Sequence, residues 1–430
     1  MVDRPPHVGF VSTRLAGTDG VSLEAFKWCR ILTSMGLECY YLAGECSTPE
    51  DKSIVIPEAH FLHPTIQALT EQLTSGQTRP PAVTREVQAL KDRLKAGLRE
   101  FVDRFDIRVL IVENALSLPV NIPLGLALAE FITETRLPTI GHHHDFSWER
   151  KRFALHAAGD YLRAAFPPNL PSLRHVVINS FAARQLALRV GASSILIPNV
   201  MDFDDPPPEP DEFAGGLAAA LDVPAGDMLI LQPTRVVPRK RIELAIELVR
   251  RLGRPATLVI SHASGDEGSA YETHLRNYAD MLSAKVVFAS DIFAGERRIL
   301  PDGRRIYSTA DAYQQARLVT YPSTVEGFGN AFLEALYYRK PLVMSRYEIY
   351  RSDIQPKGFR IIAFDEFISD ETLDQVRSVL DDPALAAAIG DHNYELGRRF
   401  YSFRTLERRL TLLVQDALGT DPEDYLFASS

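Results

Sequence analysis

Residues 320–345 read TYPSTVEGFGNAFLEALYYRKPLVMS. The apolar, β-branched run that begins at Leu318 predicts the end of a buried parallel strand, and Pro322 stops it. A glycine loop follows, and Asn330 then opens a run with high helix propensity. In open α/β sheets, ligands bind beyond the carboxyl ends of strands, where glycines let the backbone approach closely and a helix N-terminus attracts anions. The stretch therefore predicts an α/β fold with a ligand site at this loop.

Two carboxylates flank the same loop. Glu326 lies within it, and Glu334 follows about one turn into the predicted helix. Because carboxylates repel phosphates, we expect both to accept hydrogen bonds from hydroxyl groups, as sugar rings would provide. Taken alone, an acid pair at this spacing is more often one helix-capping carboxylate and one solvated charge.

The succession of strand, Pro-Ser, EGFG, helix and second Glu resembles the E-x7-E segment of retaining, nucleotide-sugar-dependent glycosyltransferases of family 4. The resemblance implies the GT-B fold, in which two Rossmann-like α/β domains face a cleft. It also implies that Glu326 holds donor-sugar hydroxyls and that Glu334 holds the ribose diol. The remaining donor-binding residues that it implies in this stretch are Gly327, Phe328, Gly329 and Asn330. The family often has an apolar residue at the position of Asn330.

The composition is that of a soluble globular protein. The 430 residues predict two domains, and 46% hydrophobic and 24% charged residues are near the usual averages. A net charge of -9 gives no support to a nucleic-acid partner. No apolar run approaches a membrane span of about 20 residues, and the first residues lack a signal-peptide pattern. We expect a cytoplasmic protein, without stable membrane insertion, whose three cysteines are reduced thiols.

The domain boundary is expected at the proline-rich run DDPPPEP, residues 204–210. An acceptor-binding domain would then span residues 1–203 and a nucleotide-sugar-binding domain residues 211–400. In GT-B enzymes a C-terminal helix commonly crosses back onto the first domain, and residues 401–430 match it. Asp202 and Asp204 mimic a metal-binding D-x-D motif, but their proline-rich context favours a hinge.

The first predicted strand, His7 to Ser12, leads into a loop with Gly17 and Gly20. The spacing G-x-x-G is not the G-x-G-x-x-G of dinucleotide-binding proteins, so it gives weak support to a nicotinamide cofactor, and a structural turn is the simpler interpretation. In the family the corresponding loop lies near the diphosphate and the acceptor. The resemblance therefore makes Gly17, Asp19 and Gly20 candidate site residues, with Gly20 expected at the donor and Asp19 at the acceptor.

A second informative stretch, PTIGHHHDFSWERKRF, spans residues 138–153. Three consecutive histidines suggest a metal, but neighbours on a strand point to alternate faces and cannot all bind one ion, so we expect no metal site. The family carries a functional His followed by Asp at the end of this strand. His144 and Asp145 match it, with His143 as the alternative if the register differs by one. The expected role of the histidine is a hydrogen bond to the donor sugar near the reacting carbon.

The sequence does not identify the acceptor. Arg150 and its basic neighbours could recognise a small anionic, sugar-like acceptor, although a surface charge is the commoner role for such residues.

A third stretch, QPTRVVPRKRI at residues 232–242, places four cations between a predicted strand and a predicted helix. That position suits phosphates, whereas a short basic cluster by itself is more often a solvated loop. In the family this loop supplies one Arg and one Lys, five residues apart, to the donor diphosphate. Arg235 and Lys240 have that spacing. The family usually has Gly where Thr234 and Arg241 stand.

Taken together, the resemblance implies a retaining enzyme that moves a hexose from a GDP-mannose or UDP-glucose type of donor to a hydroxyl of a small soluble acceptor. It implies no metal and no cofactor besides the nucleotide sugar. The residues expected to act in catalysis are His144, Arg235, Lys240 and Glu326. Two alternatives stay open: an NAD(P)-dependent oxidoreductase and a non-catalytic nucleotide-sugar-binding protein. The oxidoreductase is disfavoured because Phe332 stands where a dinucleotide motif that begins with Gly327-x-Gly329 would need its third glycine. The oligomeric state is not predicted.

Overall fold

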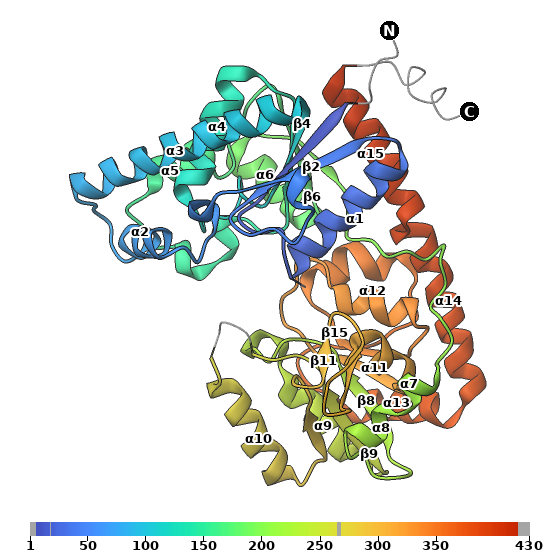
Figure 1. The fold of residues 1–430 in the computed structure, drawn as a ribbon. Helices are drawn as coiled ribbons and strands as arrows, with labels where there is room; N and C mark the ends of the chain where they lie inside the picture. The colour runs from blue at the N-terminus through green and yellow to red at the C-terminus, as the bar shows by residue number, and fades with distance from the viewer. Residues whose placement is uncertain (1–5, 18, 265–267, 420–430) are drawn as a thin grey trace. The chain divides into compact units, whose positions relative to one another are not determined.

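The computed structural model describes residues 6–17, 19–264 and 268–419 (Figure 1). Its backbone divides into two compact units. One comprises the chain up to Asn199 together with the chain from Phe403 onward, and the other runs from Val200 to Ser402. Among the helices of the described ranges, none is long and apolar enough to cross a membrane.

The first unit is built on a seven-stranded sheet in the order β3-β2-β1-β4-β5-β6-β7. All pairings in it are parallel. Its strands are β1 (His7–Val11), β2 (Glu38–Ala43), β3 (Ser53–Val55), β4 (Ile107–Glu113), β5 (Thr139–His143), β6 (Leu173–Val177) and β7 (Ser194–Leu196). Six of the seven residues of β4 are buried, as a strand covered on both faces requires.

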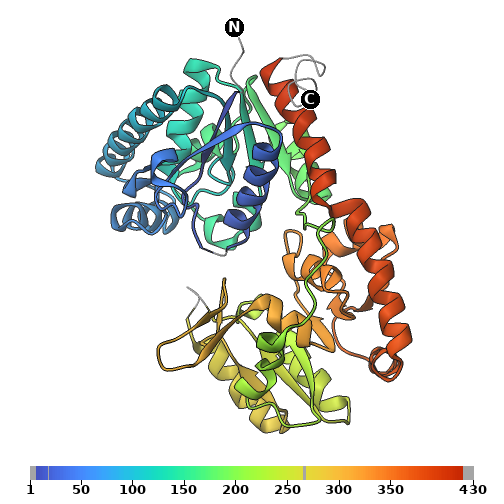
Figure 2. The ribbon, with the colours of Figure 1, turned by 45° about the vertical axis from the view of Figure 1, so that its right-hand side comes forward.

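Helices cover both faces of this sheet (Figures 1 and 2). The helices of this unit are α1 (Gly20–Ser34), α2 (Pro64–Thr74), α3 (Pro81–Phe105), α4 (Ile122–Thr135), α5 (Gly159–Ala165), α6 (Ser180–Val190) and α15 (Phe403–Leu418), of which α2 packs on α3 and α5 on α4. In α3 seven buried apolar residues recur at spacings of three and four: Val83, Val87, Leu90, Leu94, Leu98, Phe101 and Phe105. Helix α4 starts at a cap formed by Asn121, whose Oδ1 accepts a hydrogen bond of 3.1 Å from the Leu124 amide.

The last helix of the described chain, α15, packs in the first unit beside α1 (Figure 2). Its Arg409 donates to the carbonyl of Leu196 at the end of β7. Its Asp416 accepts a 2.6 Å hydrogen bond from Arg174 on β6. These contacts join residues that are more than 200 positions apart in the chain.

The second unit has a six-stranded, all-parallel sheet in the order β10-β9-β8-β14-β15-β16. Its strands are β8 (Met228–Gln232), β9 (Ala256–Ile260), β10 (Val286–Phe288), β14 (Leu318–Tyr321), β15 (Leu342–Ser345) and β16 (Ile362–Phe364). A small side sheet consists of β11 (Phe293–Ala294), β12 (Arg298–Ile299) and β13 (Arg305–Ser308).

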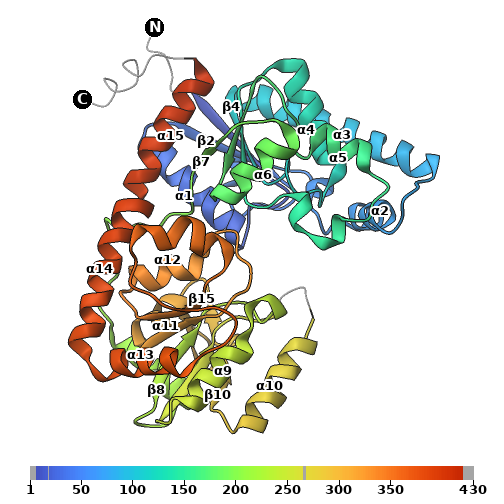
Figure 3. The same ribbon diagram turned by 180° about the vertical axis from the view of Figure 1, so that it is seen from behind.

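The helices of the second unit are α7 (Glu212–Gly215), α8 (Leu217–Ala220), α9 (Ile242–Arg251), α10 (Ala270–Leu282), α11 (Thr309–Gln315), α12 (Asn330–Tyr337), α13 (Asp370–Asp381) and α14 (Pro383–Tyr401). Helix α12 packs against α14, as Figure 3 shows. The core of this unit is an aliphatic cluster that joins β8, β9 and α9 to α13.

The division between the units falls before Val200, ahead of the boundary expected at residue 203. The reason is the packing of Phe203. Its ring is T-shaped against Tyr337 and Tyr394, at centroid distances of 5.9 and 5.3 Å. Its carbonyl also accepts a 2.7 Å hydrogen bond from the Tyr394 hydroxyl. These contacts are internal to the second unit, so the chain enters that unit before the proline-rich run.

Each sheet has one point where its strand order reverses. In the first unit the chain runs outward from β1 through β2 and then returns to β4 on the other side of β1. In the second unit it runs outward from β8 through β9 and returns to β14 on the other side of β8. Loops that leave two such strands diverge, and open α/β sheets bind ligands at this point. A ligand is therefore expected at the loops after β1, β4, β8 and β14.

Candidate active site

The loops after β8 and β14 are joined by an ion pair in the second unit. Lys240 donates a hydrogen bond to Oε1 of Glu326. Arg239 donates one hydrogen bond to Oε2 of Glu326 and one to the carbonyl of Val325, both at 3.3 Å. The backbone carbonyl of Arg239 in turn accepts from the amide and the hydroxyl of Thr324, at 2.9 and 3.1 Å. The two loops thus form one charged structure at the reversal point of the sheet.

The pair is largely shielded from water, since the side chains of Lys240 and Glu326 are 9% and 10% exposed. Burial alone would raise the pKa of Glu326, but the charges of Lys240 and Arg239 outweigh it and hold that pKa below its ordinary value. Burial lowers the pKa of Lys240, and Glu326 opposes part of the shift. The Lys240 ammonium also lies 5.1 Å from the ring centroid of Tyr321, in cation–π range.

The two arginines near this pair are placed differently. Arg235 has an exposed side chain, although it is close enough for its charge to act on Lys240. Arg239, which was not singled out, is the arginine that contacts Glu326. Its position in a run of four cations was the available signal.

His262, which the sequence gave no reason to choose, lies close to Lys240 and Arg235. His262 follows β9, the strand next to β8, and its Nδ1 lies 2.8 Å from the Ser261 hydroxyl. Burial, together with the charges of Lys240 and Arg235, lowers the pKa of His262. A neutral imidazole beside two cations can accept a hydrogen bond or donate one without adding charge.

The glycine loop before α12 has the conformation that its sequence suggests. Gly329 has φ 120° and ψ 83°, in a region that L side chains rarely adopt. A Cβ built at Gly329 would lie 2.8 Å from the Tyr347 hydroxyl. That hydroxyl donates a 2.6 Å hydrogen bond to the carbonyl of Phe328. Phe328 is 2% exposed and its ring packs T-shaped on Tyr401, so its side chain is part of the packing of the second unit.

The rest of the predicted donor residues lie along the same segment. Gly327 is half-buried in the loop, and Asn330 is the first residue of α12. Glu334, also half-buried, lies one turn further on, beside the phenol of Tyr313. Burial and then the charge of Glu334 raise the pKa of Tyr313 well above its ordinary value. The structure thus brings Lys240 and Glu326 into contact and places Glu334 on the adjoining helix.

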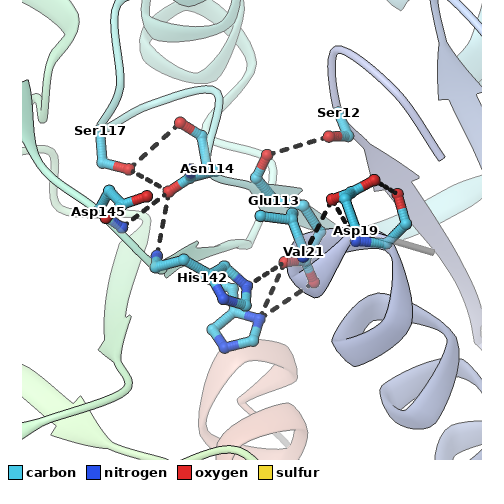
Figure 4. Close-up of polar contacts among 10 residues, drawn as sticks. Ser12, Asp19, Val21, Glu113, Asn114, Ser117, His142 and Asp145 are labelled. Carbon is cyan, nitrogen blue, oxygen red and sulfur yellow. Dashed lines mark hydrogen bonds and ion pairs between the residues drawn. The ribbon is translucent and has the colours of Figure 1, made fainter. Parts of the chain in front are cut away.

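In the first unit, polar residues gather where β4 and β5 end (Figure 4). Glu113, the last residue of β4, is completely buried and faces two imidazoles. Its carboxylate lies 2.9 Å from Nδ1 of His142 and 3.2 Å from Nε2 of His144. The indole of Trp28, from α1, stacks on the His142 ring at 4.1 Å. Glu113 was not a predicted site residue.

The alternation of a strand separates the three histidines. His142 and His144 turn to Glu113, whereas His143 turns to the opposite side and pairs with His175 of β6, Nε2 to Nδ1, at 2.9 Å. His143 is 0% exposed and His144 is 8% exposed. Of the two alternatives for the functional histidine, the structure therefore places His144 next to the other polar groups of this cluster.

The expectation that three consecutive histidines cannot share one ion agrees with this alternation, but it overlooked the pair at positions i and i+2. Glu113, His142 and His144 are a set of metal-ligand types whose ligand atoms lie within 4.8 Å of one another. The contacts of 2.9 and 3.2 Å are also ordinary hydrogen-bond lengths, so the carboxylate and the two imidazoles satisfy one another without an ion.

The side chain of Asn114 holds the backbone of the His144 segment. Its Oδ1 accepts from the amides of His144 and Asp145, at 3.0 and 3.2 Å, and from the Ser117 hydroxyl at 3.0 Å. Figure 4 shows these bonds converging on one oxygen. The loop after β4 thereby fixes the end of β5.

The residues predicted to bind the acceptor have partners within the first unit. Asp19 is the N-cap of α1, which begins at Gly20: its Oδ1 accepts from the Val21 and Ser22 amides, and its Oδ2 pairs with Arg14 at 3.0 Å. Asp145 accepts a 2.8 Å hydrogen bond from Arg150, whose side chain is 41% exposed. Gly17, in the same loop as Asp19, has φ 75°.

Comparisons with known proteins agree with this architecture. Residues 306–396, which include the glycine loop and α12, match the family described as Glycosyl transferases group 1. The chain is 30% identical over 423 residues to mannosylglucosylglycerate synthase of Thermotoga maritima, covering 90% of this chain and 95% of that protein. It is 32% identical over 380 residues to the enzyme of the same name from Petrotoga mobilis, covering 83% and 86%.

Solved structures share the fold across nearly the whole chain. A glycosyltransferase from Rickettsia africae superposes with a TM-score of 0.67 at 13% identity, over 97% of this chain and all of that one. Anabaena HepE in complex with UDP-glucose superposes with a TM-score of 0.64 at 13% identity, over 95% and 99%. Two parallel-sheet α/β units with such neighbours define a GT-B glycosyltransferase, which confirms the predicted fold class.

The chain belongs to the group 1 glycosyltransferases. It is thus an enzyme of the transferase class, and neither the oxidoreductase nor the non-catalytic alternative is retained.

Proposed function

We propose that this enzyme transfers a hexose from a nucleoside-diphosphate sugar to a hydroxyl group of a small, soluble, sugar-like acceptor, with retention of anomeric configuration and without a metal. The observation that carries the proposal is the charged structure at the reversal point of the second sheet. There Lys240, Arg239 and Arg235 gather where β8 and β14 end. Cations and a glycine loop at the start of a helix suit a diphosphate.

The chemistry needs such a site. As the glycosidic bond of the donor breaks, negative charge develops on the departing diphosphate and positive charge on the sugar. Fixed cations stabilise the departing diphosphate, and a buried position strengthens their effect. In this proposal Lys240 and Arg235 serve the diphosphate, while Glu326 accepts hydrogen bonds from the sugar and Glu334 from the ribose. Because Glu326 already has Lys240 as a partner, its charge is offset when the diphosphate binds.

In the first unit, His144 is proposed to hydrogen-bond the transferred sugar. Asp145 and Arg150 are proposed to meet the acceptor, since Arg150 is partly exposed and can turn its planar group to a carboxylate.

The relatives suggest which sugars to try. The name of the Thermotoga and Petrotoga enzymes describes a product with mannosyl, glucosyl and glycerate parts. We therefore propose a nucleotide mannose, of the GDP-mannose type, as the first donor to test, with UDP-glucose as the second. A glucosylated glycerate is the corresponding acceptor, and its carboxylate would suit Arg150.

A donor screen tests the proposal. Release of nucleoside diphosphate is measured for UDP- and GDP-sugars, with and without pooled acceptors that include glucosylglycerate and sugar phosphates. We expect one donor to be consumed, and faster when an acceptor is present. Equal, slow hydrolysis of every donor regardless of acceptor would argue against transfer to a small acceptor.

A further inference from the structure

The Glu113 carboxylate is held rigidly at the reversal point of the first sheet. Its side chain is completely buried, and its backbone carbonyl accepts a 3.2 Å hydrogen bond from the Ser12 hydroxyl at the end of β1 (Figure 4). Nδ1 of His142 lies against both of its oxygens, at 2.9 and 3.1 Å. A carboxylate fixed in this way cannot follow the His144 ring, so the ring must take its orientation from the carboxylate.

His144 is restrained from two directions, and both restraints come from the end of β4. Its amide donates to Oδ1 of Asn114 at 3.0 Å, and its Nε2 faces Oε2 of Glu113 at 3.2 Å. Because Nε2 is committed to Glu113, Nδ1 is the ring nitrogen that remains for a ligand. The ring has little freedom otherwise, since its side chain is 7% exposed.

We propose that Glu113 is a positioning residue for His144: by accepting the Nε2 hydrogen, it fixes the tautomer and orientation of the imidazole so that Nδ1 faces the transferred sugar. This inference rests on the proposed function for the role of His144, but the pairing itself is independent of it. A carboxylate behind an imidazole both selects the tautomer and stabilises the imidazolium.

Electrostatics around the ring support the geometry. The charged and titratable groups that face His144 are Glu24 from α1, Glu113 from β4, and His142 and Asp145 from its own segment. Burial would lower the pKa of His144, but the hydrogen bond and charge of Glu113, with smaller effects from Glu24 and Asp145, outweigh it and raise that pKa. Burial alone would raise the pKa of Glu113. The charges and hydrogen bonds of the two imidazoles outweigh burial and lower this pKa to about 2.

The pKa of His142, the second imidazole in contact with Glu113, shifts in the opposite direction to that of His144. Burial lowers the pKa of His142 below its ordinary value, despite the nearby charge of Glu113. The Glu113 carboxylate therefore lies between two imidazoles whose pKa values shift in opposite directions.

The test uses the full-length protein with 15N-labelled histidine. The pH titration and tautomer of His144 are followed by NMR, and its signals are assigned from their loss in His144→Gln. The test variant is Glu113→Gln, which keeps the shape of the side chain but removes its charge. The matched control is His175→Gln, which disturbs the neighbouring buried histidine pair of the same sheet without touching Glu113.

We expect Glu113→Gln to lower the pKa of His144 and to lose the single Nε2-protonated tautomer, whereas His175→Gln changes neither. In turnover, we expect Glu113→Gln to lower kcat about 10- to 100-fold, to shift the pH profile in the same direction, and to leave KM for the donor nearly unchanged. Glu113→Asp keeps the charge and should recover part of the loss; it also serves as the test variant if Glu113→Gln does not fold.

An unchanged His144 titration and tautomer in folded Glu113→Gln would overturn the inference. Stoichiometric binding of added Zn²⁺ that is lost in Glu113→Gln would overturn it as well, because Glu113 would then be a metal ligand. If the NMR changes occur but no donor is ever turned over, the pairing stands and the proposed function fails, so the two failures are distinguishable.

Discussion

Lys240 donates a hydrogen bond to the carboxylate of Glu326, and both side chains are about nine-tenths removed from solvent. A diphosphate that binds at the end of β8 must therefore share Lys240 with a carboxylate of the protein. The Glu326 carboxylate favours the charged form of the buried Lys240 ammonium. Without that carboxylate, burial would lower the pKa of Lys240 further.

Lys240→Ala tests the role of this cation. We expect kcat/KM for the donor to fall about a hundredfold, or roughly 3 kcal/mol, as when one donor that stabilises a developing anion is removed. Steady-state kinetics with the donor identified by the screen measure the effect. Since the substitution also leaves Glu326 buried without Lys240, its folding is checked by circular dichroism. Arg250→Ala, an exposed cation at the end of α9, is the matched control and should be silent. Wild-type turnover by a folded Lys240→Ala enzyme would refute the assignment.

We expect Arg235 to bind the nucleoside diphosphate and Arg239 to stabilise the fold. Arg239 is bonded to Glu326 and Val325, whereas Arg235 is exposed. We expect Arg235→Ala to weaken binding of the nucleoside diphosphate about tenfold at low salt, with little change in melting temperature. Arg239→Ala should instead lower the melting temperature by a few degrees, because it breaks a largely buried contact. Calorimetry and thermal unfolding separate the two, and the reverse pattern would mean that sequence spacing misidentified the phosphate ligand.

Gly329→Ala should destabilise the second unit more than an ordinary glycine substitution. Gly329 has φ 120°, and an added Cβ would lie 2.8 Å from the Tyr347 hydroxyl. Gly253→Ala is the comparison, because Gly253 also has positive φ, +69°, but nothing lies within 4 Å of its Cβ position. Strain of this kind costs about 1–3 kcal/mol, so Gly329→Ala should cost strain plus the clash and Gly253→Ala strain alone. Equal losses in thermal unfolding would show that the close contact relaxes freely.

The His143 and His175 pair predicts a loss of stability in mild acid. Burial lowers the pKa of His143 well below its ordinary value and that of His175 to about 4. An unfolded histidine titrates near 6.5, so between about pH 6.5 and 4 the unfolded chain binds protons that the native pair does not. Stability therefore falls as the pH falls through this window. His175 alone contributes on the order of 3 kcal/mol, at about 1.4 kcal/mol for each pKa unit.

Unfolding midpoints from pH 7.5 to 4.5 measure this effect. The wild-type curve should be steeper than that of His175→Gln, in which one of the two titrating groups is gone. Parallel curves would show that carboxylates, and not this pair, control the acid sensitivity.

Local pattern predicted the elements well. The α/β class, the strand that stops at Pro322 and the helix that begins at Asn330 all follow from apolar residues and helix propensities that lie close together in the chain. The loop at Glu326 and the basic loop at Lys240 were recognised through the family resemblance, and the structure brings them into contact.

What sequence missed depends on strand order. Glu113 lies about 30 residues before His144, and only the adjacency of β4 and β5 brings them together. The contact of Arg239 with Glu326 depends on which side chain the loop turns inward, which sequence spacing does not reveal.

The product of the reaction tests the central claim most directly. The enzyme is incubated with GDP-mannose or UDP-glucose and glucosylglycerate, with Lys240→Ala as the matched inactive control, and the product is analysed by mass spectrometry and NMR. The account predicts an acceptor that is heavier by one hexose unit, linked with the same anomeric configuration as in the donor, and absent or greatly reduced with Lys240→Ala. A product of inverted configuration would contradict retention, and donor hydrolysis without any glycosylated acceptor would contradict the proposed transfer.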